Sequence, residues 1–373
     1  MGRMRRIQIL SASLLLTLAG CSSTPKFTMW DGGGMDSAPP QKPTQPSTQT
    51  NRVVVPPTPP PKAVTNASTI PAISTAPVVS SPSSDTWIAL GIWCRTTGLA
   101  KLTQLPGEKP ISYQLENAAG KIEFTIGSQV ARWNGMNFML SFAPRLTEHH
   151  PCVHHLDLEK SLLPILNQCA GAAFTNKTIV LDPGHGGEQT GTRSVIGNHF
   201  EKEYTLDWAL RLQKILVNKG WKVILTRSND FDVALSNRVA LAERSAADVF
   251  ISLHFNSAGS EQSGLETYCV TPLGLPSNLT RDYPDDPARI VPNNAFDLSN
   301  FCLALKLHRS ILKETKESDR SVRRARFMTV LRGQNRPAVL IEGGYLSNRK
   351  EAGLIATGEY RQKLAQAVAD ALP

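Results

Sequence analysis

From about residue 175 to the end of the chain, short apolar segments alternate with amphipathic helical segments, and this alternation constrains the fold more than any other feature. Apolar strands separated by helices predict a central, largely parallel sheet with helices on both faces. The expected strands are 177–181, 222–226, 248–253, 265–271, 327–331 and 338–341, and the expected helices are 204–219, 239–247, 298–315 and 359–372. We therefore expect a three-layer α/β/α domain over residues 173–373.

The chain ahead of this domain divides into two further parts. Residues 21–85 are rich in Pro, Ser and Thr and poor in large apolar residues, which predicts a disordered tether. Alternating apolar patterns return at 122–126 and 138–142, and a helical pattern follows at 156–168, so we expect a small β-rich α+β domain over residues 86–172. This part distantly resembles the N-terminal domain of copper amine oxidases, which would imply binding to the cell wall or to a partner.

The first twenty residues have the pattern of a secretory signal peptide. A basic start is followed by an apolar run from Ile7 to Leu18 that is shorter than the ~20 residues needed to span a bilayer. The segment Leu-Ala-Gly-Cys that ends at Cys21 resembles the bacterial lipobox, which implies that Cys21 is the lipidated first residue of the mature chain. By the same resemblance, Ser22 favours anchoring to the outer membrane, facing the periplasm.

The charge of the chain agrees with a place in the cell envelope. The formal net charge is +9, but three arginines lie in the segment expected to be removed, so the mature protein is only mildly basic. Such a charge suits a polyanionic wall or a membrane surface. The sequence has no Lys/Arg stripe with interleaved aromatic residues, so we expect no binding to nucleic acid.

Polar side chains follow three of the predicted strands. His185 lies on a Gly-rich turn after the first strand, His254 follows the strand 248–253, and Glu342 follows the strand 338–341. In open α/β sheets ligands gather at the carboxyl ends of the strands, and Glu201 opens the helix that follows the first strand. Two imidazoles and one carboxylate are the usual ligands of a catalytic zinc, with the fourth position left to water.

Several ordered motifs resemble one enzyme family. They are Ile-Val-Leu-Asp-Pro-Gly-His-Gly-Gly at 179–187, Glu-Lys at 201–202, Thr-Arg at 226–227 followed by Leu235 and Arg238, Ala-Asp-Val-Phe-Ile-Ser-Leu-His-Phe-Asn at 247–256, and Pro-Ala-Val-Leu-Ile-Glu-Gly-Gly-Tyr-Leu-Ser-Asn at 337–348. From residue 178 to 372 the chain resembles the zinc-dependent N-acetylmuramoyl-L-alanine amidases of the Amidase_3 type. The resemblance covers about half of the chain.

This resemblance implies a role for each matching residue. The zinc ligands would be His185, Glu201 and His254, and the catalytic carboxylate would be Glu342. Glu203 could take the place of Glu201, but Lys202 reproduces the Glu-Lys step of the family and favours Glu201. We interpret Arg227 and Arg238 as structural residues that form ion pairs or anchor helices.

The expected reaction is hydrolysis of the amide between N-acetylmuramic acid and L-alanine in peptidoglycan. Zinc would activate a water molecule, Glu342 would take its proton and pass it to the leaving amine, and Asn256 would orient the substrate. Besides peptidoglycan and the membrane, the expected partners include a divisome or other envelope protein. Two alternatives are a zinc peptidase that acts on other wall peptides and a non-catalytic wall-binding lipoprotein.

Two other segments bear on the prediction. A Pro-rich insertion at 272–292 argues against one long blocking helix over the site, so we expect an enzyme that needs no helix-displacing activator. The histidines at 149, 150, 154 and 155 could suggest a second metal site, but neighbouring side chains on a strand point in opposite directions, so we favour surface or domain-junction histidines.

Overall fold

A computed structural model describes residues 86–107, 109–169, 174–280 and 284–373. The expected signal peptide at 1–20, the lipidated Cys21 and the tether at 21–85 lie outside the described residues. Within the described ranges, no helix combines the length and the apolar character that a membrane span requires.

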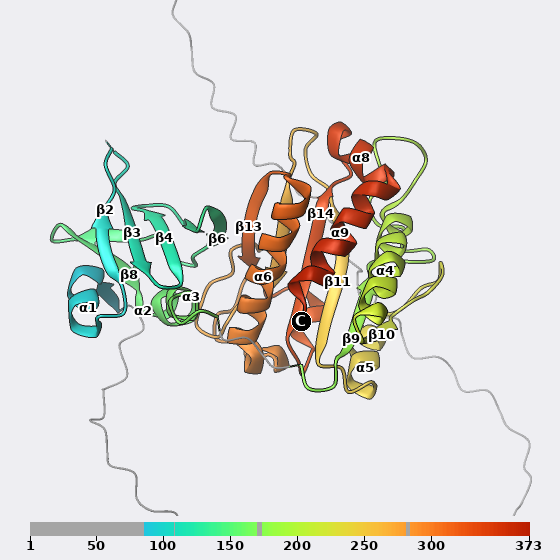
Figure 1. Ribbon diagram of the computed structural model, residues 1–373, viewed down its shortest axis with the longest axis horizontal. Helices are drawn as coiled ribbons and strands as arrows, with labels where there is room; N and C mark the ends of the chain where they lie inside the picture. The colour runs from blue at the N-terminus through green and yellow to red at the C-terminus, as the bar shows by residue number, and fades with distance from the viewer. Residues whose placement is uncertain (1–85, 108, 170–173, 281–283) are drawn as a thin grey trace, which may run out of the picture. The chain divides into compact units, whose positions relative to one another are not determined.

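A parallel sheet forms the centre of the C-terminal half (Figure 1). Its first four strands lie in the order β10 (Lys222–Leu225), β9 (Thr178–Pro183), β11 (Val249–Asn256) and β14 (Ala338–Tyr345). All of β9 and β14 is buried, as expected for strands covered by helices on both faces. β12 (Leu265–Cys269) then pairs antiparallel with β14, and β13 (Asp319–Arg324) pairs parallel with β12. The sheet is therefore largely parallel, as predicted.

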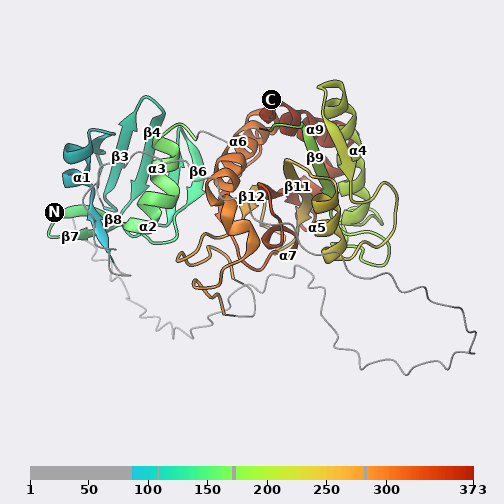
Figure 2. The same ribbon diagram turned by 90° about the horizontal axis from the view of Figure 1, so that it is seen from below.

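Helices cover both faces of this sheet (Figure 2). One layer contains α4 (Glu201–Asn218), α6 (Asp297–Thr315) and α9 (Gly358–Ala371), which pack on alternate residues such as Leu253 and Ile341. The other layer contains α5 (Leu235–Arg244) and α7 (Thr329–Arg332), which pack on Val180, Phe250 and Leu340. A short helix, α8 (Arg349–Ala356), follows β14. The three-layer α/β/α fold is thus confirmed.

One predicted strand is wrong. The apolar segment 327–331 consists of two irregular residues and the start of the short helix α7, and the strand lies upstream in β13, at Asp319–Arg324. Strand β13 is rich in charged residues, but its arginines form hydrogen bonds and ion pairs with residues of other elements. The guanidinium of Arg324 lies over the ring of Phe301 and donates to Ser161 Oγ at 2.7 Å. Tertiary pairing therefore outweighs the low strand propensity of this charged segment.

The residues before the parallel sheet form short strands and helices. A meander contains β2 (Lys101–Gln104), β3 (Ser112–Asn117), β4 (Gly120–Thr125), β5 (Val130–Trp133) and β6 (Met136–Met139), and a small sheet contains β1 (Trp87–Ala89), β7 (Arg145–Thr147) and β8 (His150–His154). The helical elements are α1 (Leu90–Thr97), α2 (His155–Asp157), the π-helix Leu158–Leu162 and α3 (Leu163–Leu166).

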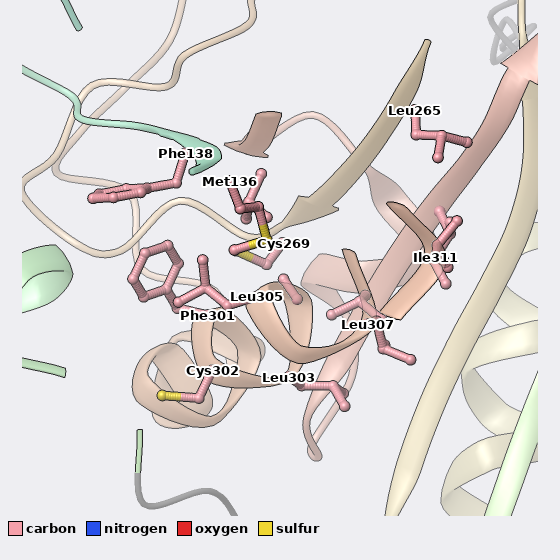
Figure 3. Close-up of a cluster of buried hydrophobic side chains, with 14 of the residues drawn as sticks. Met136, Phe138, Leu265, Cys269, Phe301, Cys302, Leu303, Leu305, Leu307 and Ile311 are labelled. Carbon is pink, nitrogen blue, oxygen red and sulfur yellow. The ribbon is translucent and has the colours of Figure 1, made fainter. Parts of the chain in front are cut away.

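Strand β6 joins this meander to the large sheet by pairing with β13 at Phe138 and Val322. The ring of Phe138 meets that of Phe301 on α6 edge-on, with centroids 6.1 Å apart. Figure 3 shows Met136 and Phe138 beside the apolar side chains of α6 and beside Cys269 of β12. The hydrophobic core is therefore continuous across the boundary that the sequence suggested near residue 172.

Candidate metal centre

The loop after β9 holds His185 in an uncommon backbone conformation. His185 has a φ of 63°, and Gly186 and Gly187 follow with φ values of 133° and 58°. Such positive φ values suit glycine and are costly for most other residues, so surrounding contacts must hold the loop. Two buried arginines provide these contacts: Arg238 donates to the carbonyl of His185 at 2.9 Å, and Arg227 donates to the carbonyl of Gly184 at 2.9 Å. Both arginines therefore have the structural role expected from the sequence.

Arg238 is itself held by a buried aspartate. Its Nη1 lies 2.6 Å from Asp182 Oδ1, and both side chains are almost fully buried. Thr226 and Ser252 donate to the same carboxylate at 2.6 and 2.8 Å. Burial opposes ionisation of Asp182, but the charge of Arg238 and these hydrogen bonds outweigh it and lower the pKa of the carboxyl. The result is a rigid buried ion pair beneath the His185 loop.

The structure brings His185, Glu201 and His254 together. His185 Nε2 lies 3.1 Å from Glu201 Oε2, and His254 Nδ1 lies 2.8 Å from Glu201 Oε1. One donor atom from each residue falls within 4.8 Å of the others. Tetrahedral ligands with bonds of about 2.0 Å are separated by about 3.3 Å, so these atoms could enclose a metal ion after small shifts. This is the one such group found in the described ranges.

Glu203, the alternative to Glu201, points elsewhere. Its carboxylate accepts from the backbone N–H of Phe200 at 3.0 Å and contacts His199 Nδ1 at 2.6 Å, in an exposed position at the start of α4. Glu201 instead is buried and also accepts from the backbone N–H of Phe255 at 3.1 Å. The structure thus brings Glu201, and not Glu203, to the two histidines.

The electrostatics of the three side chains favour a cation. Burial of Glu201 opposes its ionisation, but the two imidazoles outweigh this effect and hold the pKa of the carboxyl well below its usual range. Burial likewise opposes the charged form of His185, yet the adjacent Glu201 carboxylate raises the pKa of the imidazole. An ionised, buried Glu201 favours positive charge on the neighbouring imidazoles. A metal ion can supply this positive charge in place of the imidazole protons.

Two glycines leave room for this arrangement. A Cβ atom at Gly184 would lie 2.2 Å from His254 Cε1, and one at Gly191 would lie 2.7 Å from both Glu201 Oε2 and His185 Cδ2. A side chain at either position would therefore occupy the space of the three donor groups. The backbone passes the cluster closely only because both positions are glycine.

Glu342 lies on the strand next to His254. The two residues are in register between β11 and β14, and side chains in register point to the same face of a sheet. Glu342 is fully buried, and its other in-register neighbour is Glu266 on β12. The structure thus places the carboxylate that the sequence selected directly beside the candidate metal ligands.

Asn256 is linked to Glu266, a residue that the sequence motifs do not single out. The amide of Asn256 donates to Glu266 Oε2 at 2.8 Å, and Tyr268 donates to the same oxygen at 2.9 Å. Glu266 is almost fully buried in β12, a strand whose five residues are all buried. A single acidic residue in a buried strand is costly unless it is paired, and this was the signal that could have revealed Glu266.

The histidines near residue 150 form no comparable group. The ring of His154 stacks on Phe142 with centroids 3.8 Å apart and lies 4.6 Å from the ring of His155. None of them belongs to a metal-ligand cluster within the described residues. His149 and His150 are exposed, and His154 is buried where β8 meets α2.

Comparisons with known proteins give one consistent family. A family model described as N-acetylmuramoyl-L-alanine amidase, Amidase_3, matches residues 179–373, more than half of the chain. Over 210 residues the chain is 31% identical to the uncharacterized protein YqiI of Bacillus subtilis, with 56% of this chain and 89% of YqiI aligned. It is 30% identical over 216 residues to the N-acetylmuramoyl-L-alanine amidase AmiA of Escherichia coli, with 52% and 74% aligned.

A solved structure also matches: the catalytic domain of CwlV, an N-acetylmuramoyl-L-alanine amidase of Bacillus (Paenibacillus) polymyxa var. colistinus, is 31% identical with a TM-score of 0.44 and covers 52% of this chain and 95% of its own. The family match covers β9, β11 and β14 together with all three candidate metal ligands and Glu342. The chain therefore belongs to the N-acetylmuramoyl-L-alanine amidase family of peptidoglycan hydrolases.

Proposed function

We propose that the chain is a zinc-dependent N-acetylmuramoyl-L-alanine amidase in which His185, Glu201 and His254 bind one Zn²⁺. The observation that carries this proposal is the convergence of two imidazoles, from the loop after β9 and from β11, with the buried carboxylate that begins α4, in a chain from this family. Nitrogen and carboxylate ligands with an open fourth position are typical of catalytic zinc. When bound, the ion would act as a Lewis acid toward the scissile carbonyl and would make a nearby water molecule more acidic.

Glu342 is the proposed proton carrier. Its register position beside His254 supports this role, because a group that takes a proton from the attacking water must lie within reach of the ligands. It would accept the proton of the water and then deliver it to the leaving nitrogen of L-alanine. The burial of Glu342 excludes bulk water from this transfer. Asn256 would orient the substrate indirectly, because its side-chain amide donates a hydrogen bond to Glu266.

Two alternatives have less support. A zinc peptidase with two metal ions would need a second group of ligands, and the described residues contain a single group. A wall-binding protein without activity would have no use for a carboxylate at Glu342, in register with the candidate metal ligand His254.

The proposed location of the enzyme rests on the sequence alone. Lipid on Cys21 would anchor the chain in the outer membrane, and the Pro/Ser/Thr-rich segment 21–85 would give the catalytic region the reach to contact peptidoglycan. Residues 86–172 would bind the wall or an envelope partner.

The test is digestion of purified sacculi with the zinc-loaded full chain, followed by mass analysis of the products. We expect glycan strands with free lactyl groups and released peptides that begin with L-alanine. Glu342→Gln should keep one zinc per chain but lose about 10²- to 10⁴-fold in rate, since the amide is nearly isosteric but cannot accept a proton. Peptides cut at internal bonds would instead support the peptidase, and a rate for Glu342→Gln close to that of the wild type would exclude Glu342 as the base.

A further inference from the structure

We propose that Arg320, supported by Arg323, binds a carboxylate of the stem peptide and so contributes to substrate selection at the proposed amidase site. The inference rests on the proposed function, because it names the part of the substrate that lies beyond the scissile amide. Arginine is suited to this task, since its planar guanidinium can hold a carboxylate through two parallel hydrogen bonds.

A β-bulge brings the two arginines to the same place. Leu265 pairs with Asp319 and Thr267 pairs with Val322, so β13 contains one residue more than β12 between these pairs. Residues three apart on a regular strand point to opposite faces, but the bulge turns Arg320 and Arg323 to the same side. Both guanidinium groups reach Glu266 Oε1, at 2.9 and 3.4 Å.

The bulge is held in place by its own contacts. Ser321 has a φ of 88°, an uncommon value for a residue other than glycine. The carboxylate of Asp319 accepts from the backbone N–H of Ser321 at 2.8 Å and pairs with His308 Nε2 at 2.9 Å. It also accepts from the backbone N–H of Asn137 at 2.6 Å. Bulges are frequent next to active sites, where they redirect a side chain.

Two guanidinium groups converge on one carboxylate at this point. Glu266 is the one carboxylate among the described residues that forms an ion pair with Arg320 or Arg323, so two cations share one anion. The side chain of Glu266 is 2% exposed, whereas those of Arg320 and Arg323 are 21% and 22% exposed. The buried Glu266 therefore holds both guanidinium groups in place, while part of each guanidinium stays exposed to solvent.

Arg320 also has donor capacity left. Its Nε donates to Glu266 at 2.9 Å and its Nη1 donates to Gln262 at 2.7 Å, and Nη2 has no hydrogen-bond partner among the residues that the structure describes. The guanidinium lies 5.1 Å from the ring centroid of Tyr345, which limits its movement. A guanidinium held on two sides, with a donor group unused, loses little entropy when it binds a ligand.

The sheet sets the distance from the metal ligands. Glu266 is in register with Glu342, which is in register with His254, so the three side chains form a row across β12, β14 and β11. Neighbouring strands are about 4.8 Å apart, which puts Glu266 about 10 Å from His254. An extended peptide covers about 3.5 Å per residue, so the bound carboxylate would belong to the second or third residue of the stem peptide.

The experiment uses the zinc-loaded full chain and three synthetic muramoyl tripeptides. One has free carboxylates, one is amidated at the second peptide residue, and one is amidated at the third. We expect wild-type kcat/KM to fall about 10- to 100-fold for one of the amidated substrates, as for loss of a hydrogen bond to a charged group. Arg320→Gln should lose a similar factor on the substrate with free carboxylates and should no longer distinguish it from that amidated substrate.

Controls separate binding from folding. Arg320→Lys keeps the charge but loses the planar fork, and it should fall between the wild type and Arg320→Gln. Arg244→Gln, on the exposed face of α5, should match the wild type on all three substrates. Zinc content and the thermal unfolding midpoint of each variant show whether it has folded.

Two results would overturn the inference. The first is that the wild type has the same kcat/KM on all three substrates. The second is that a folded Arg320→Gln loses the same factor in kcat/KM on the amidated substrates as on the substrate with free carboxylates. If the wild type cleaved none of the three, the proposed function itself would be wrong.

Discussion

Gly184→Ala is expected to remove the metal without disturbing the fold. Gly184 directly follows β9, whose last residue, Pro183, is in register with Leu253, the neighbour of His254. Gly184 is not among the glycines with positive φ, so alanine can adopt its backbone conformation. The substitution therefore tests the space around His254 and little else.

The size of the effect follows from the geometry. The new Cβ would lie 2.2 Å from His254 Cε1, 2.4 Å from Nε2 and 2.7 Å from Nδ1. Ordinary contacts between such atoms are about 3.5 Å or longer, so the ring must move by roughly 1.3 Å. Metal–ligand distances tolerate about 0.2 Å. Changes in residues that only orient ligands already weaken metal binding about 10- to 100-fold, and we expect a displaced ligand to cost at least about 100-fold.

Metal content after dialysis and competition with a chelator measure this loss. Gly353→Ala is the matched control, because its Cβ would lie 3.6 Å from Ile196 Cδ1 in ordinary contact, on helix α8. The control should keep zinc and gain up to about 1 kcal/mol of stability, as glycine is a poor helix former. A Gly184→Ala protein with one zinc per chain and a rate within two-fold of the control would refute the assignment of His254 as a ligand.

Three further predictions concern stability, regulation and location. Asp182→Asn should cost about 3–5 kcal/mol of unfolding free energy at neutral pH, because it leaves Arg238 buried without a counter-charge. The pKa of Asp182 is lowered on folding, so its contribution to stability is present above its unfolded pKa of about 3.9 and is lost as the pH falls through the folded value. Below about pH 5, the free energy of unfolding should therefore fall less steeply with decreasing pH in the variant than in the wild type. The purified chain should digest sacculi without an added protein, since residues 270–280 and 284–291 contain no helix that could block the site, and strict dependence on a second protein would contradict this. Cys21→Ser should lose fatty-acid labelling and membrane sedimentation while it keeps activity on soluble wall fragments, and a variant that still labels would disprove the lipobox assignment.

The sequence alone predicted the three-layer fold, the family, the two histidines and the two glutamates of the proposed site. It could do so because apolar periodicity sets the type of each element, and because the carboxyl ends of parallel strands meet at one edge. Polar residues toward the carboxyl end of a strand can therefore be recognised from the order of amino acids in the chain, although β11 and β14 extend beyond His254 and Glu342. The lipidated Cys21 and the tether were also predicted from the sequence, and they stay predictions.

The tertiary structure decided what depends on contacts between distant segments. The Glu-Lys step already favoured Glu201 over Glu203, and the structure supplies the physical reason: both glutamates lie in the first turn of the same helix, but Glu201 makes the 2.8 Å contact to His254. Strand β13 was missed because its charged residues become compatible with a sheet only when Glu266 and other buried partners are present. Its bulge, and with it the orientation of Arg320, is fixed where the carboxylate of Asp319 accepts a hydrogen bond from the backbone N–H of Asn137, 182 residues away in the chain. Local propensity contains no information about such partners, because pairing between segments that are distant in the sequence exists only in the folded chain.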